Sequence, residues 1–203
     1  MGESSTIGTA AEPELTLEQW AGLPEDEPGE LVDGRLEEEE VADIIHEAVV
    51  TWLVHVFRSW LAGRRAVVAG SEAKYAVRQR RGRKPDLAVY LPGSRRPPGR
   101  GLVRVPPDIA VEVLSPTPRD ERRDRLDKPD DYAAFGVRWY WLVDPRLRSL
   151  EILELGADGR YVRALGAGGE RVEVVPGCQG LVLELPALWS EVEDLEREEP
   201  AAG

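Results

Sequence analysis

An acidic residue in the middle of an apolar stretch, Ile109-Ala-Val-Glu-Val-Leu114, limits how this chain can fold. The β-branched residues and the flanking prolines predict a strand. Alternation along a strand places Glu112 on the same face as Ala110 and Leu114. Burial of an unpaired carboxylate is costly. Glu112 therefore either faces solvent or is held in a site, and its apolar neighbours favour the site.

Two further segments carry side chains that suit chemistry on a phosphodiester. The tripeptide Lys84-Pro85-Asp86 opens an apolar run, and proline is ordinary there because the first residue of a strand need not donate to the ladder. Asp124, Lys128 and Tyr132 follow at steps of four, so on a continuous helix they share one face. Two carboxylates can hold a divalent metal on a phosphate, and a lysine can orient the attacking water.

The lysine of this constellation has alternatives. Asp124 and Lys128 could be an ordinary surface ion pair worth about 0.3 kcal/mol. However, the chain has only three lysines, and arginine supplies nearly all the other positive charge. A retained lysine indicates a role that needs the smaller, more readily titrated cation. Lys74, on a neighbouring predicted strand, competes with Lys128 for that role.

Three other features have an ordinary structural explanation. His46, on a long predicted helix, is more typical of a helix surface or cap than of a ligand. Glu30, which opens a predicted hairpin, could be a plain acid at a strand edge. The Trp139-Tyr140-Trp141 cluster alternates within a strand without interleaved basic residues, which favours sheet packing over base stacking.

Charge is unevenly distributed. The net charge of −12 argues against nucleic acid, because phosphate contacts need Lys and Arg. Residues 64–104, however, hold twelve basic side chains and two acids, so this band is +10 and the remainder is −22. The band could attract a polyanion locally, or it could be a solvated loop balanced by the acidic ends.

The order of predicted elements indicates an α/β (α+β) fold. Its mixed sheet would be flanked by helices and closed by an antiparallel C-terminal meander. The helices are expected at 15–23 with Thr16 as N-cap, 41–62, 119–135 ending at Gly136, and 185–196. The strands are expected in a 30–36 hairpin around Asp33-Gly34, at 66–69, 73–77, 87–91, 109–114 and 138–144, and in the meander 150–155, 160–164 and 171–175.

Length and composition predict one domain, residues 15–196, between disordered tails at 1–14 and 197–203. No apolar run approaches the roughly 18 residues of a membrane span, and the N-terminal segment lacks the pattern of a secretory signal. The single cysteine, Cys178, suits packing in a reducing compartment. We therefore expect a cytoplasmic protein without a membrane partner.

Several quoted segments together resemble the Uma2 family. They are Gly29-Glu-Leu-Val-Asp-Gly34, His46, Lys84-Pro-Asp-Leu-Ala-Val89, Pro107-Asp-Ile-Ala-Val-Glu-Val-Leu-Ser-Pro116, Asp124-x3-Lys128-x3-Tyr132 and Gly136-Val-Arg-Trp-Tyr-Trp-Leu-Val-Asp-Pro145. These small bacterial proteins are placed among the PD-(D/E)XK nucleases. The resemblance covers about residues 15–190 and implies a restriction endonuclease-like core.

By this resemblance, Asp86 and Glu112 would hold Mg²⁺ (or Mn²⁺), Lys128 would serve the hydrolytic water, and Glu30 and His46 match positions that support the same site. The common pattern places its lysine two residues after the second acid, where this chain has Leu114. The lysine must then have moved to position 128. Because Pro129 follows it, Lys128 would end one helix or cap another.

The resemblance implies a Mg²⁺-dependent endonuclease that hydrolyses DNA. The basic band would contact the phosphate backbone through Arg78, Arg80, Arg81, Arg83 and Lys84. A homodimer or higher homo-oligomer is expected, because cutting two strands benefits from two sites. The alternatives are a catalytically inactive nucleic-acid-binding or regulatory module on the same fold, and an interaction protein that assembles through a sheet edge or its aromatic strand.

Overall fold

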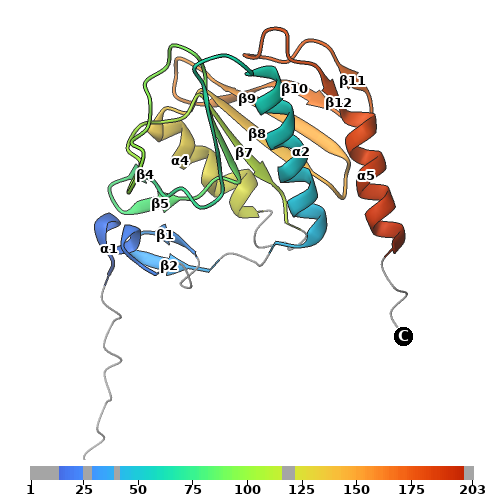
Figure 1. The fold of residues 1–203 in the computed structure, drawn as a ribbon. Coiled ribbons are helices and arrows are strands. Elements are labelled where there is room, and N and C mark those ends of the chain that lie inside the picture. Colours follow the sequence, from blue (N-terminus) through green and yellow to red (C-terminus); the bar gives the residue numbers. More distant parts are fainter. Residues whose placement is uncertain (1–13, 25–28, 39–41, 116–121, 199–203) are drawn as a thin grey trace, which may run out of the picture.

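The computed structural model describes residues 14–24, 29–38, 42–115 and 122–198 (Figure 1). Its centre is a six-stranded sheet in the order β10-β9-β8-β7-β6-β3, in which β7 and β8 are parallel and all other neighbours antiparallel. The strands are β3 Val67–Gly70, β6 Leu87–Tyr90, β7 Ile109–Val113, β8 Trp139–Asp144, β9 Ser149–Leu155 and β10 Tyr161–Ala167. The predicted mixed sheet is confirmed.

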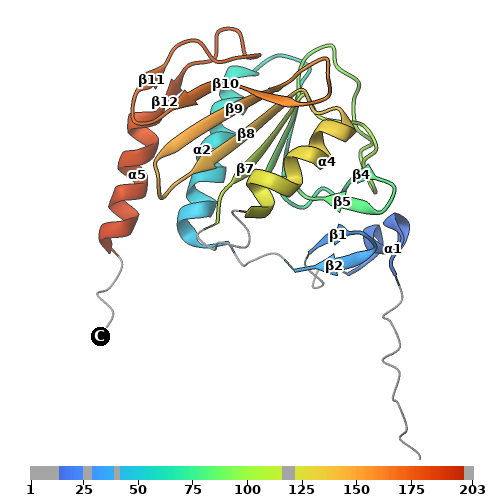
Figure 2. The same cartoon turned by 180° about the vertical axis from the view of Figure 1, so that it is seen from behind.

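Helices cover both faces of this sheet. Figure 1 shows α2 (Ile44–Trp60) and α5 (Leu185–Glu198) on one face, and Figure 2 shows α4 (Lys128–Phe135) on the other. The helix α2 begins after Asp43, whose carboxylate accepts the His46 backbone N–H at 2.7 Å. The helix predicted from residue 41 therefore starts three residues later, at Ile44, and Val41 lies outside the described residues. None of the described helices is long and apolar enough to cross a bilayer.

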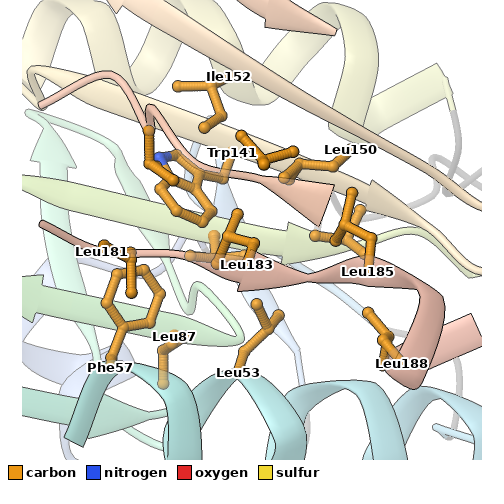
Figure 3. Close-up of a cluster of buried hydrophobic side chains, with 14 of the residues drawn as sticks. Leu53, Phe57, Leu87, Trp141, Leu150, Ile152, Leu181, Leu183, Leu185 and Leu188 are labelled. Atoms are coloured by element: carbon orange, nitrogen blue, oxygen red, sulfur yellow. The ribbon is translucent and has the colours of Figure 1, made fainter. Parts of the chain in front are cut away.

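The main core lies between α2, α5 and the sheet. Figure 3 shows Leu53 and Phe57 of α2 facing Trp141 and Ile152 of the sheet, with Leu183 from the chain before α5 packed among them. The Phe57 and Trp141 ring centroids are 5.1 Å apart. The aromatic strand is thus packing material, as predicted, and it is not available as an exposed surface for assembly.

The opposite face of the sheet carries Glu112. The predicted alternation is correct: Ala110, Leu114 and Tyr140 share this face, while their neighbours in β7 and β8 point into the main core. This face is covered by α4, and Glu112 is only 2% exposed. The alternative that Glu112 faces solvent is therefore wrong, because both faces of β7 are buried.

A smaller antiparallel sheet, β2-β1-β5-β4, lies beside the helix α1, which the predicted N-cap Thr16 opens with a capping box. The helix α1 spans Leu17–Ala21, and the strands of the small sheet are β1 Glu30–Val32, β2 Arg35–Glu37, β4 Tyr75–Arg78 and β5 Arg81–Arg83. The predicted hairpin turn is confirmed, with positive φ at Asp33 (50°) and Gly34 (84°). The strand β5 was not predicted. There the Gly82 backbone packs directly on Trp20, where a Cβ would lie 2.2 Å from the indole ring.

The helix predicted over 119–135 is not regular. Residues 119–121 lie outside the described part, and a π-helical turn, η1 (Arg123–Asp127), precedes α4. The Lys128 backbone N–H donates to the Arg123 carbonyl five residues back. Pro129 has no N–H to donate to the Asp124 carbonyl in the same pattern, and the Tyr140 hydroxyl donates to that carbonyl at 2.8 Å. Gly136 ends α4 with φ of 93°, as predicted.

The prediction of a C-terminal meander is only partly correct. The strands β9 and β10 pair as predicted, but the third strand is the short β11 (Arg171–Val172), which pairs with β12 (Leu183–Glu184) in a separate sheet. The last helix, α5, is confirmed and reaches Glu198, two residues beyond the predicted domain boundary. The predicted tails lie almost entirely outside the described residues.

Candidate active site

The predicted metal ligands and the predicted catalytic lysine line one pocket. Its volume is about 240 Å³, and it opens where the start of α2, the start of β6, the end of β7 and η1 come together. Asp86, Glu112, Lys128 and His46 all line it. Glu30 is fully buried behind it, with one carboxylate oxygen 3.8 Å from the Lys128 ammonium. The structure therefore brings together two predicted acids, the predicted lysine and both supporting residues.

Lys128 stands among three carboxylates. Its Nζ donates to Glu112 Oε2 at 2.8 Å and lies 2.9 Å from Asp124 Oδ1, in addition to the longer contact with Glu30. The side chain is 3% exposed, so a surface ion pair does not describe it. The competing Lys74 lies elsewhere and donates to the Trp20 carbonyl at 2.9 Å.

Glu112 is held from two sides. While Oε2 accepts from Lys128, Oε1 accepts a hydrogen bond from the Tyr132 hydroxyl at 2.6 Å. Burial raises the pKa of Glu112 well above its ordinary value, although Lys128 opposes the rise. Burial likewise raises the pKa of Asp124, again against Lys128. Burial thus disfavours the ionised forms of both carboxyl groups.

Asp86 is oriented by the backbone and by a histidine. Its Oδ2 accepts the Val113 backbone N–H at 2.7 Å, so the carboxylate is fixed across the β6–β7 pair next to Glu112. The Nε2 of His46 lies 3.3 Å from the same oxygen. Burial alone would lower the pKa of His46, but Asp86 raises it on balance. His46 therefore points into the site, and its backbone N–H alone takes part in the helix cap.

Glu30 belongs to a buried ionic network. One oxygen accepts from the Arg83 guanidinium at 2.7 Å and the other from the Lys84 backbone N–H at 2.8 Å. Burial would raise the pKa of Glu30, but Lys128, Arg83 and Arg123 lower it below its ordinary value. Glu30 is thus an ionised support for Lys128, and it is not a plain acid at a strand edge.

The basic residues predicted to contact DNA differ in their placement. Arg83 is 1% exposed, and its guanidinium is held by Glu30 and by Asp131 of α4, so it does not fit the predicted contact with phosphate. Arg78 and Arg81 also pair with Asp131, and Arg80 contacts Asp33 and Glu14. Lys84 is the one of this group that lines the pocket.

Sequence reasoning missed four residues of this site. Asp124 and Tyr132 stood in the predicted motif without a role, and their steps of four from Lys128 were the signal for both. Arg123 lines the pocket but lay hidden in the charged run 119–125. Asp131, fully buried against three arginines, carried no signal because an acid on a helix is usually solvated.

Metal-ligating side chains are present without forming a closed cage. Among the residues that the structure describes, no three His, Cys, Asp or Glu side chains are grouped as a metal site. The predicted ligands Asp86, directly before β6, and Glu112, on the adjacent β7, both line the pocket. A metal held here would need further ligands from substrate or water.

Comparisons with known proteins identify a family and a fold. A family model described as "Uma2: Putative restriction endonuclease" matches residues 15–186. The fold is similar to a crystal structure described as that of a putative nuclease belonging to DUF820, from Anabaena variabilis ATCC 29413. That likeness has a TM-score of 0.69 at 19% identity and covers 88% of this chain and 99% of that chain, which shows a shared fold. No match was found among curated proteins.

Proposed function

The chain belongs to the Uma2 family, and from this membership we propose that it is a Mg²⁺-dependent endonuclease that hydrolyses phosphodiester bonds of DNA. The observation that carries the proposal is the contact between Lys128 and Glu112 beside Asp86 in one pocket. Lys128 is a buried cation held by Glu112, and the partly exposed carboxylate of Asp86 lies beside them. Phosphate hydrolysis needs such a combination of metal-binding carboxylates and a cation.

The residues present fit a divalent cation. Mg²⁺ is usually bound through one or two carboxylates together with substrate phosphate oxygens, rather than by a cage made of protein alone. Asp86 and Glu112 supply two such carboxylates at the pocket wall. Burial raises the pKa values of Glu112 and Asp124, and a cation bound beside them would favour their ionised forms. When bound, Mg²⁺ would polarise the phosphate and lower the pKa of a water molecule.

The protein side chains have separate roles in this proposal. Lys128 orients the attacking water and stabilises the negative charge that develops on the phosphate oxygens. Tyr132 and Lys128 fix the Glu112 carboxylate, while Val113 N–H fixes Asp86. In the reaction, a bond forms between the water oxygen and phosphorus, and the bond from phosphorus to the leaving sugar oxygen breaks.

A second function is favoured by one observation. Both carboxylate oxygens of Glu112 already accept hydrogen bonds from protein side chains. A site that keeps these contacts would bind nucleic acid without cutting it. The protein would then be a nucleic-acid-binding or regulatory module on the nuclease fold, because fold alone does not set function.

Cleavage of circular DNA separates the two functions. Single-stranded and duplex circles are incubated with the protein in Mg²⁺, in Mn²⁺ and in EDTA, and the products are resolved by electrophoresis. The endonuclease converts circles to linear or nicked forms only with metal. Binding that retards the circles in every condition, without any cut product, would instead identify the inactive module.

The predicted homodimer or higher homo-oligomer stays a prediction. Sedimentation of the purified protein, alone and with DNA, measures it. A dimer would supply two pockets to one substrate.

A further inference from the structure

A second hollow adjoins the candidate active site. It has a volume of about 750 Å³ and lies between the end of α1, the start of β4 and the loop 98–103. It shares two lining residues, Glu72 and Lys84, with the catalytic pocket. The two hollows therefore meet at the ion pair between these residues, whose atoms are 3.2 Å apart. We call this second hollow the side groove.

The side groove carries positive charge. Lys74, Lys84 and Arg100 line it, against the single acid Glu72. Two of these cations are anchored: Lys74 donates to the Trp20 carbonyl at 2.9 Å, and the Lys84 side chain is only 11% exposed. Anchored cations lose little side-chain freedom when an anion arrives, which favours binding of a phosphate.

Apolar side chains line part of the wall. Leu23 and Pro24 after α1, together with Pro98 and Leu102 of the loop, line the same hollow as the three cations. In a duplex, the faces of the bases are stacked inside and only phosphates and groove edges reach a protein. In a single strand, both the phosphates and the base faces are available for contact. Cations beside an apolar wall therefore suit an unpaired strand.

We propose that the side groove binds a single-stranded segment of the nucleic acid that enters the catalytic pocket, so that the enzyme prefers substrates with unpaired strands. This inference rests on the proposed function, because the bound single strand is taken to run from the side groove into the pocket where it is cut. Lys84 lies at the junction and contacts a phosphate next to the one that is cut.

Glu72 regulates entry to the groove. It stands in the turn between β3 and β4, is 83% exposed and pairs with Lys84. An exposed carboxylate is held weakly, because surface ion pairs contribute about 0–1 kcal/mol. An arriving phosphate therefore displaces Glu72 from Lys84, and the carboxylate acts as a competitor for the phosphate site.

Matched charge variants test this assignment in EDTA, where no hydrolysis occurs. Binding of a labelled single strand, and of its duplex, is measured by fluorescence anisotropy. Arg100→Gln is compared with Arg104→Gln, which removes the same charge four residues away but outside the groove. Glu72→Gln is compared with Glu18→Gln, another exposed acid in an ion pair. Thermal unfolding confirms that all four variants are folded.

The wild type is expected to bind the single strand more tightly than the duplex. Arg100→Gln should weaken single-strand binding about three- to tenfold and lower the salt slope by about 0.7, while Arg104→Gln changes neither appreciably. Glu72→Gln should strengthen binding about threefold, unlike Glu18→Gln. Equal effects within each matched pair, or equal affinity for duplex and single strand, would overturn the groove assignment.

The binding and cleavage readouts can fail independently. If binding depends on the groove but no DNA is cut, the groove assignment stands and the endonuclease proposal fails. If DNA is cut at wild-type rate by Arg100→Gln with unchanged single-strand affinity, the endonuclease stands and the groove assignment fails.

Discussion

The ammonium nitrogen of Lys128 lies 2.8 Å from a carboxylate oxygen of Glu112, although the two residues belong to a helix and a strand and are sixteen positions apart. Lys128 is the first residue of α4, between the π-helical turn η1 and Pro129. This position sets the direction in which its side chain points. A lysine that the usual motif would place on the strand thus reaches the same acid from α4.

Lys128→Met is expected to destabilise the fold strongly. The substitution leaves Glu112, Asp124 and Glu30 without their shared cation, and removing one partner of a buried ion pair costs about 3–5 kcal/mol. Urea unfolding at neutral pH measures the loss. In the control, Lys74→Met removes a hydrogen bond to a carbonyl and should cost about 1–2 kcal/mol. Equal losses for the two variants would contradict the buried cluster.

Tyr132→Phe separates positioning from packing. It removes the hydroxyl that donates to Glu112, and we expect cleavage to fall at least about tenfold because the carboxylate is no longer held in one orientation. Tyr161→Phe is the matched control, since that hydroxyl donates to the Val137 carbonyl. Both changes should cost about 1–2 kcal/mol of stability. A comparable loss of cleavage rate in both would assign the effect to stability alone.

Glu30→Gln should reveal a stability contribution that depends on pH. The folded-state pKa of Glu30 lies below its ordinary value of 4.5, so its ionised form stabilises the fold above that pH, and the stabilisation is lost as pH falls through the lowered pKa. The variant is expected to be about 3–5 kcal/mol less stable near neutrality. That gap should shrink steadily below pH 4.5.

Urea unfolding over a series of pH values measures the gap. The exposed Glu18, paired with Arg104, provides the control, and Glu18→Gln should change stability by at most about 1 kcal/mol near neutrality. A gap for Glu30→Gln that stays constant into acid would show that its ionisation does not support the fold.

Gly82→Ala tests the strand that was not predicted. A Cβ at this position would lie 2.2 Å from the Trp20 ring, so we expect overpacking to cost about 1–3 kcal/mol. At Gly70 the added Cβ would meet no atom within 4 Å, and Gly70→Ala should change stability by less than about 0.5 kcal/mol. Thermal unfolding compares the two, and similar melting temperatures would contradict the close packing of β5 on α1.

The sequence was sufficient for the parts of the site that break a local pattern. Glu112 interrupts an apolar strand, and the cost of burying its charge predicted partners. Asp86 begins the neighbouring strand, and Lys128 was one of three lysines in an arginine-rich chain. Glu112 and Lys128 are unusual within their own short segments, whereas Asp86 after a proline is ordinary at a strand start and was singled out only together with them.

The buried arginine network could not be predicted in the same way. Arg83 belongs to a charged run, and its carboxylate partners Asp131 and Glu30 lie 48 and 53 positions away. Pairing of β1 with β5 brings Glu30 to Arg83, and the contact of the small sheet with α4 brings Asp131 to it. The alternation in Arg81-Gly82-Arg83 was a strand signal, but charge on both arginines indicated solvent instead of a buried face.

The pairing predicted for the third strand of the meander is wrong for a related reason. Residues 171–175 have strand-like composition, yet β11 pairs with β12 rather than with β10. Local composition predicts that a segment is extended, whereas the choice of partner depends on contacts far along the chain.

Whether the pocket of Asp86, Glu112 and Lys128 cuts DNA is tested most directly by the initial rate of Mg²⁺-dependent cleavage by Glu112→Gln. Glu154→Gln is the matched control, because Glu154 lies on β9 of the same sheet, outside the pocket. We predict that Glu112→Gln loses at least about 100-fold in rate while Glu154→Gln keeps the wild-type rate. Wild-type cleavage by a folded Glu112→Gln variant would contradict the claim.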